Sequence, residues 1–291
     1  MTSFVSGDVR AHRAADEARL DWLEVRQGEA PLLVSLPHTG THLPPELESS
    51  LVSPWLARKD ADWWVDHLYT FAADLGATTV RTALSRTAID VNRDPSGVSL
   101  YPGQATTELC PITTFDGQLL YRRDAELTSD EVAARRARWF DPYHATLDAE
   151  VARLKARHGC VVVYDCHSIR SVIPRLFDGR LPVFNVGTNG GASCAPDLQD
   201  AVEGVCRATG AEHGRQRTLP RRLHHATPRT AGRWHPRSPD GTRLHGYMRE
   251  PEIDVEEGDW PTSYDPAYAA PVRGALDRVL RACLGFAAIA G

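Results

Sequence analysis

The chain has 291 residues, of which 42% are hydrophobic and 24% charged, and its formal net charge at pH 7 is −5. These proportions match globular averages and exclude the disordered class, and the acidic balance provides no basic face for nucleic acid. The sequence has no run of 18 apolar residues, and its N-terminus has neither the basic nor the apolar region of a signal peptide. We therefore expect a cytoplasmic protein without nucleic-acid or membrane partners. It should form one α/β domain over residues 1–291, with residues 1–30 as an N-terminal extension.

The first part of the chain predicts an edge strand at residues 22–23, a buried strand over residues 31–37 and a helix over residues 60–76. The buried strand is apolar and runs into His38, which a turn follows. The helix has aspartates near its start and a glycine at its end, as helix termini often do.

Two more strands are predicted over residues 78–83 and 88–93, and the second ends in Asn92 and Arg93. An Asn-Arg pair at a strand end is either turn chemistry or a grip for a carboxylate, because guanidinium is a planar fork with two parallel donors. Residues 95–122 are rich in glycine, proline and threonine, which indicates an ordered loop of the kind that walls an active site.

The second half predicts a long helix, a strand and two further helices. Thr128 and Glu131 form a capping box that opens the long helix, and Pro142 should kink or split it. A strand at 182–187 is followed by a glycine-rich turn whose free N–H groups can hold an anion. The last two helices are expected over residues 196–209 and 269–288.

The stretch over residues 160–168 is the centre of the predicted fold. Its apolar residues do not alternate with polar ones, which predicts a strand covered on both faces, and the run ends in Asp165 and His167. Ligands bind at the carboxyl ends of strands in open α/β sheets, so His167 and His38 are candidates for chemistry. The alternative is a capping aspartate and a buried histidine with structural partners. A thiol nucleophile at Cys166 is disfavoured, because neighbouring side chains of a strand point to opposite faces.

Segment ends repeatedly deliver histidine, carboxylate and arginine, a set that suits a mononuclear zinc hydrolase. The six cysteines include no CxxC pair, which excludes a zinc ribbon. A di-manganese ureohydrolase is disfavoured, because this sequence lacks the further Asp/His clusters that such a site needs. A non-enzymatic metal- or amino-acid-binding protein on the same scaffold stays open. The candidate residues are His38, Asp62, Arg86, Asn92, Arg93, His167 and Arg170.

Several short motifs are specific as a set. They are Pro37-His38-Thr-Gly, Asp60-Ala-Asp62-Trp, Ser85-Arg86 through Asp90-Val-Asn92-Arg93, Leu109-Cys-Pro, Phe115-Asp-Gly117, Asp165-Cys-His167-Ser168 and Asn185-Val-Gly187-Thr. Together they resemble the N-formylglutamate amidohydrolase (N-formylglutamate deformylase) family. The resemblance implies a three-layer α/β/α fold with a mixed central sheet, like that of zinc carboxypeptidases. It also implies hydrolysis of N-formyl-L-glutamate to formate and L-glutamate, or deacylation of another N-acyl amino acid or small peptide.

The same resemblance implies roles for single residues. One Zn²⁺ per chain would be held by His38, His167 and Asp62, with Asp60 as the second carboxylate candidate. Arg86 would polarise the substrate carbonyl. The remaining candidates would bind the carboxylates of the substrate. For Arg170, the alternative is a solvent-exposed position without a role in binding. These candidates are Asn92, Arg93, Arg170, Thr188 and Asn189.

The late part of the chain departs from the family, whose relatives carry a glutamate base in a run like His-Ala-x-Gln-x-Glu-Leu-Ala. Here residues 215–243 are rich in arginine, which indicates either a solvated loop or a polyanion site. Codons for residues 233–243, read one nucleotide later, can spell Gly-Gly-Ile-His-Ala-Val-Gln-Met-Glu-Leu-Ala. We therefore hypothesise a double frameshift over about residues 216–244. Otherwise Glu250 or Glu252 would have to replace the base.

Overall fold

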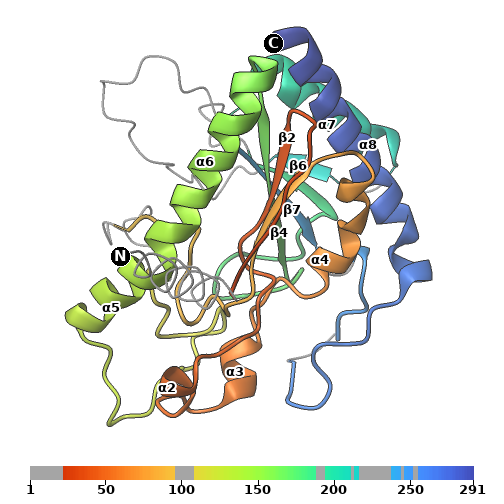
Figure 1. The fold of residues 1–291 in the computed structure, drawn as a ribbon. Helices are drawn as coiled ribbons and strands as arrows, with labels where there is room; N and C mark the ends of the chain where they lie inside the picture. The colour runs from red at the N-terminus through yellow and green to blue at the C-terminus, as the bar shows by residue number, and fades with distance from the viewer. Residues whose placement is uncertain are drawn as a thin grey trace, which may run out of the picture.

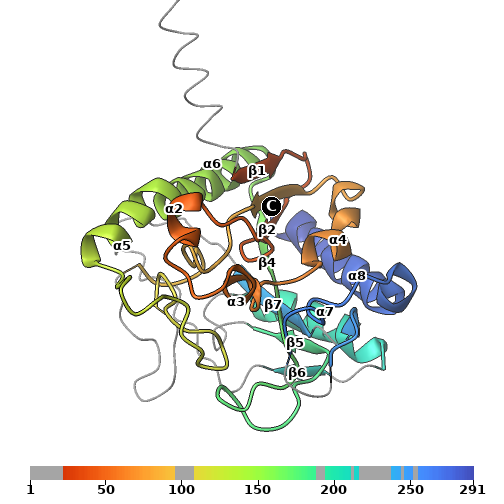
Figure 2. The same ribbon diagram turned by 90° about the horizontal axis from the view of Figure 1, so that it is seen from below.

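The computed structural model describes residues 22–95, 108–187, 194–210, 213–215, 237–243, 246–251 and 255–291. Within these residues seven strands form one mixed sheet in the order β1-β3-β2-β4-β7-β5-β6. Figure 1 shows helices on both sides of this sheet, and Figure 2 shows the same three layers from below. The predicted three-layer α/β/α fold with a mixed central sheet is confirmed.

Parallel strands occupy the middle of the sheet, and antiparallel pairs flank them. β2 lies between β3 and β4 and is parallel to both, and β4 is also parallel to β7. β1 pairs antiparallel with β3 at one edge, as expected for an edge strand near residue 22, and β5 joins β7 antiparallel and β6 parallel. The strands are β1 (Leu23–Arg26), β2 (Leu32–Leu36), β3 (Thr78–Thr82), β4 (Val162–Ile169), β5 (Phe184–Val186), β6 (His213–Arg215) and β7 (Arg237–Arg243).

The absence of alternation in β2 has a direct structural reason, because both faces of the strand are buried. Leu32 and Val34 pack in a cluster with α7 (Pro196–Ala208) and α8 (Pro266–Ala290), whereas Leu33 packs in a second cluster with α6 (Asp141–His158). β4 behaves in the same way, with Tyr164 in the first cluster and Val163 in the second. Burying each such side chain contributes about 1.5–3 kcal/mol, so the two-sided cover fixes these strands at the centre.

The helices divide between the two faces, with α5 and α6 on one side and α4, α7 and α8 on the other (Figure 1). The helices predicted at 196–209 and 269–288 are confirmed as α7 and α8. None of the helices in the described part of the chain combines the length and hydropathy needed to cross a bilayer. The helices are α2 (Pro45–Glu48), α3 (Pro54–Arg58), α4 (Val65–Leu68), the 3₁₀ helix η1 (Thr70–Ala73), α5 (Ser129–Arg135), the π-helical turn η2 (Arg136–Phe140), α6 (Asp141–His158), α7 (Pro196–Ala208) and α8 (Pro266–Ala290).

The long predicted helix is present and runs without a gap, but a π-helical turn next to Pro142 interrupts its α-helical geometry. Thr128 caps α5 by accepting a hydrogen bond from the backbone of Glu131 at 3.2 Å. The π-helical turn η2 directly precedes Pro142, which stands in the first turn of α6. Proline lacks an N–H and its ring would clash with the carbonyl four residues earlier, and the wider turn absorbs both effects.

Two predicted elements are wrong. The helix expected over residues 60–76 begins only at Val65, because Trp64 adopts a left-handed conformation that no α-helix continues through. It is then interrupted at Tyr69, which lies between α4 and η1 and has non-helical backbone angles (φ −95°, ψ 14°). The strand expected over residues 88–93 is a loop. There the side chain of Asp90 accepts a hydrogen bond from the backbone of Asn92 at 3.0 Å, a turn that competes with strand pairing.

Candidate metal centre

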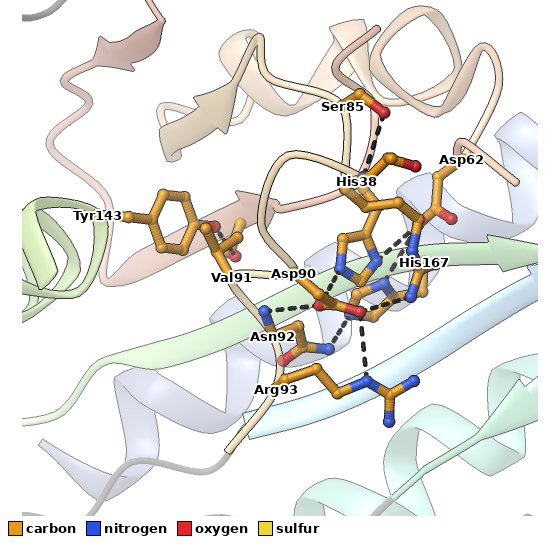
Figure 3. A network of polar contacts seen from close by, with 12 residues as sticks. His38, Asp62, Ser85, Asp90, Val91, Asn92, Arg93, Tyr143 and His167 are labelled. Atoms are coloured by element: carbon orange, nitrogen blue, oxygen red, sulfur yellow. Dashed lines mark hydrogen bonds and ion pairs between the residues drawn. The ribbon is translucent and has the colours of Figure 1, made fainter. Parts of the chain in front are cut away.

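Two histidines and one aspartate converge at the carboxyl ends of the central strands. His38 lies two residues beyond β2, and His167 lies near the end of β4, the strand next to β2. Because β2 and β4 are parallel, both imidazoles reach the same edge of the sheet. Asp62 lies in the loop before α4. Its own backbone N–H donates to the carbonyl of His38 at 2.9 Å. Figure 3 shows the three side chains facing one another.

The distances fit a shared cation. Asp62 Oδ2 lies 3.2 Å from His167 Nδ1 and 3.8 Å from His38 Nδ1, and one ligand atom from each residue lies within 4.8 Å of the others. All three side chains are buried, and Asp62 Oδ1 is a buried oxygen without a hydrogen-bond partner among the described residues. An unsatisfied carboxylate oxygen beside two imidazoles is an arrangement that a bound metal ion would satisfy.

The outer nitrogen of each imidazole has its own partner. His38 Nε2 donates to Asp90 Oδ1 at 2.7 Å, which leaves the lone pair of Nδ1 on the side of Asp62. His167 Nε2 lies 2.8 Å from the Asn92 side-chain amide. That amide can offer its oxygen or its nitrogen, so it is compatible with either tautomer of His167. Such outer contacts orient metal-binding histidines.

Asp90 organises the loop around the centre, a role that sequence reasoning missed. Besides His38, its carboxylate accepts from Arg86 Nη2 at 2.6 Å and lies 3.3 Å from Arg93 Nε. Arg86 is 8% exposed and its guanidinium lies 4.8 Å from the Phe115 ring centroid. The sequence signal was the Asp-x-Asn spacing, which is typical of a side-chain turn rather than of a strand end.

The protonation states at the centre suit a divalent cation. Burial, reinforced by the charge of Arg86, lowers the pKa of His38 to about 4, so this ring is neutral at pH 7. Burial opposes ionisation of Asp62, but its hydrogen bond with His167 and the nearby charges, that of Arg86 among them, together outweigh burial and lower the pKa of the carboxyl. Burial is likewise outweighed at Asp90, where His38 and Arg86 hold the pKa well below its usual range. A neutral imidazole and an ionised carboxylate are the forms that bind metal.

A glycine explains how the loop after β2 reaches the centre. A side chain at Gly40 would place its Cβ 2.3 Å from the backbone of Leu84, so only glycine permits this approach. The contact is reinforced because the backbone of His42 donates to the carbonyl of Ala83 at 2.9 Å. His38 is thereby held close to the loop that carries Arg86 and Asp90.

A second charged cluster adjoins the centre. Arg170 donates to Asp116 Oδ2 at 2.7 Å and lies 3.4 Å from Asp60 Oδ1, and Lys59 Nζ lies 2.7 Å from Asp116 Oδ2. Asp60 also accepts from the backbone of Phe115 at 2.6 Å, and its burial raises the pKa of its carboxyl despite Arg170. The structure therefore places Asp62, and not Asp60, in the group with the histidines. The side chain of Arg170 is only 10% exposed, so the solvent-exposed alternative for this residue is wrong.

The remaining candidates lie elsewhere or beyond the described residues. Glu250 accepts hydrogen bonds from both the backbone and the hydroxyl of Ser171, so its carboxylate is engaged with the loop after β4. Cys166 packs in the cluster with α7 and α8, one residue from His167 and on the other face of the strand. Three of the candidate residues lie outside the described part of the chain: Thr188, Asn189 and Glu252.

The fold and the site together define an α/β protein with a buried His-Asp-His centre, at the carboxyl ends of parallel strands, that could hold a metal ion. The model of the N-formylglutamate amidohydrolase family matches residues 30–235, and the chain belongs to this family.

Named relatives agree with this assignment. The chain is 47% identical over 186 residues to an N-formylglutamate deformylase of Pseudomonas aeruginosa, a match that covers 64% of this chain and 70% of the relative. It is 38% identical over 271 residues to an N-formylglutamate deformylase of Pseudomonas putida, with 91% and 97% coverage. The crystal structure of an N-formylglutamate amidohydrolase from Ralstonia eutropha JMP134 superposes with a TM-score of 0.67 at 27% identity, covering 90% of this chain and 97% of that one.

Proposed function

We propose that this chain hydrolyses the N-formyl amide of N-formyl-L-glutamate to formate and L-glutamate, using one zinc ion held by His38, Asp62 and His167. The observation that carries the proposal is that the Nδ1 atoms of His38 and His167 lie 3.8 Å and 3.2 Å, respectively, from one buried carboxylate oxygen, Asp62 Oδ2. Relatives named N-formylglutamate deformylase support the choice of substrate. Two histidines and a carboxylate are a ligand set of zinc hydrolases, in which bound zinc acidifies water and polarises a carbonyl.

Arg86 is the proposed donor to the carbonyl oxygen as negative charge develops there. Its contact with Asp90 fixes the plane of the guanidinium, and its position over the Phe115 ring shields it from water. A buried, fixed cation stabilises developing charge more strongly than a mobile one, because it needs no reorganisation during the reaction. Arg86 therefore serves as the oxyanion-stabilising residue in this proposal.

The two carboxylates of the substrate need two cationic partners, for which Arg93 and Arg170 are proposed, assisted by Asn92, Thr188 and Asn189. Arg170 Nε is buried and has no hydrogen-bond partner among the described residues. A buried donor in this state is a favourable site for a carboxylate oxygen. Arg93 lies beside Asp90 with its side chain 23% exposed, so a ligand can reach it.

The general base is proposed to belong to β7. This strand is parallel to β4, and the register places Gly241 beside His167. β7 has neighbours on both sides, yet Pro239 stands in its middle, where proline is ordinarily excluded. In the shifted reading the strand becomes Ala-Val-Gln-Met-Glu-Leu-Ala, and its glutamate falls across positions 241 and 242. There it would take a proton from water and return it to the leaving amine.

Zinc content and formate release test the proposal together. We expect His167→Ala to lose stoichiometric zinc and any turnover, whereas His158→Ala, on the exposed end of α6, should keep both. Full zinc content in His167→Ala would overturn the ligand assignment.

The substrate is tested by comparing N-formyl-L-glutamate with N-acetyl-L-glutamate and a formylated dipeptide. Faster release of the acyl group from N-acetyl-L-glutamate or from the formylated dipeptide than from N-formyl-L-glutamate would favour a deacylase of different specificity. A chain that carries the shifted reading of residues 216–244 and binds zinc and substrate, but releases no formate, would indicate a binding protein.

A further inference from the structure

The loop that carries Asp62 is held by two aromatic side chains from far along the chain. Tyr247 donates its hydroxyl to the carbonyl of Trp63 at 2.8 Å, and Trp260 Nε1 donates to the carbonyl of Lys59 at 2.9 Å. Both side chains are fully or almost fully buried, at 0% and 3% exposure. The two carbonyls flank Asp62, one after it and one before it, so these contacts fix the loop on both sides of the candidate ligand.

Two further indole contacts join the same parts of the molecule. Trp64 Nε1 donates to the carbonyl of Thr262 at 2.9 Å, and Trp55 Nε1 donates to the carbonyl of Trp260 at 3.0 Å. The backbone of Trp64 has φ 62° and ψ 8°, a left-handed conformation that is uncommon for a large side chain. Such a conformation persists only where surrounding contacts enforce it, and here it lies two residues after Asp62.

The same segment also holds the strand that carries His167. Glu250 Oε1 accepts from the backbone N–H of Ser171 at 2.9 Å, and the Ser171 hydroxyl donates to Glu250 Oε2. Ser171 lies two residues beyond β4, whose end carries His167. One stretch of chain thus contacts both the loop of Asp62 and the end of the strand of His167.

We propose that residues 246–251 and 255–262, here called the brace, set the position of Asp62 relative to His167 and thereby the metal affinity of the centre. The inference rests on the proposed metal site. A cation binds tightly only when its donors are already at suitable separations, and contacts behind the ligands typically change metal affinity 10–100-fold. Tyr247 and Trp260 act through the backbone carbonyls of Trp63 and Lys59, one residue after and three residues before Asp62, so they are positioning residues and not catalytic ones.

The test is a zinc titration by competition with a chromophoric chelator, on the full chain. Tyr247→Phe removes one hydroxyl and keeps the ring, and we expect it to weaken zinc binding about tenfold. Trp260→Phe should have a similar effect. The matched control is Tyr69→Phe, which also removes one buried hydroxyl, here one that lies 3.2 Å from the hydroxyl of Tyr164 on β4. Its zinc affinity should equal that of the unmodified chain.

The outcomes separate the two proposals. An unmodified chain that binds no zinc would refute the metal site itself. The brace has no positioning role if the unmodified chain binds zinc and the zinc affinities of both Tyr247→Phe and Trp260→Phe are within twofold of its affinity. Equal weakening in Tyr69→Phe would also refute the proposal, because the effect would then follow from any lost buried hydrogen bond. Circular dichroism of each variant shows whether the fold is retained.

Discussion

Replacing Asp90 with asparagine removes one charge from a carboxylate on which four groups converge. Its oxygens accept from His38 at 2.7 Å, from the backbone of Asn92 at 3.0 Å and from Arg86 at 2.6 Å, with Arg93 at 3.3 Å. Asparagine has nearly the same shape, so the packing is preserved. It has one acceptor oxygen in place of two, and its NH₂ group must face either the imidazole N–H or a guanidinium.

Two magnitudes follow from this geometry. Arg86 is 8% exposed and would lose the charge that compensates it, and breaking a buried pair in this way costs about 3–5 kcal/mol. We expect the free energy of unfolding of the metal-free protein to fall by about 3 kcal/mol, the lower end, because asparagine retains one hydrogen bond. Zinc affinity should fall about 10–100-fold, because His38 is no longer held in the tautomer that leaves Nδ1 free.

Urea denaturation in the presence of a chelator measures the first quantity, and a competitive zinc titration measures the second. Asp277→Asn is the control, because Asp277 pairs with Arg281 on the exposed side of α8 and should affect neither quantity. A lower free energy of unfolding with unchanged zinc affinity would confine Asp90 to a structural role. An Asp90→Asn protein unchanged in both would refute the reasoning altogether.

Four other measurements bear on the site. As the pH falls from 6.5 to 4, the metal-free protein should lose about 3 kcal/mol of unfolding free energy, because unfolded His38 takes up a proton near pH 6.5 and folded His38 only near pH 4. His38→Asn should flatten that part of the denaturation profile. Free zinc at one hundred times its Kd should raise the free energy of unfolding by about 2.7 kcal/mol, and His167→Ala should abolish the increase. A chain carrying the shifted reading of residues 216–244 should release formate at least about 100-fold faster than the chain as written. The gene's codons decide that hypothesis directly, since a shifted frame that does not encode the glutamate motif would end it.

The two histidine-bearing strands could be predicted because their signal is local. β2 and β4 are short apolar runs without alternation, and each leads into a histidine. Parallel pairing then brings His38 and His167 together without further information. The same logic correctly separated Cys166 from His167, because it depends only on the alternation of side chains along a strand.

The surroundings of the ligands could not be predicted, because local patterns there favour the wrong structure. The apolar residues after Asp62 are spaced as in a helix, yet Trp64 leaves helical geometry where its indole donates to the carbonyl of Thr262. Asp90 stands in a β-branched stretch that favours a strand, but its side chain closes a turn with Asn92. The partners of the loop that carries Asp62 lie 184 and 201 residues away in sequence, beyond the reach of any periodicity.

The π-helical turn η2 (Arg136–Phe140) lies between α5 and α6, and the number of residues in this turn sets where Arg135 lies relative to the loop that bears Asp90. Arg135, just before the turn, donates to the carbonyl of Ala88 at 3.2 Å and to Tyr121 at 2.8 Å, and Ala88 belongs to the loop that bears Asp90. Each residue of an α-helix rotates the chain by about 100°. Deleting one residue from η2 would make a regular helix but would swing Arg135 away from that loop. Insertions and deletions should therefore be poorly tolerated at this junction, although none of its side chains touches the centre.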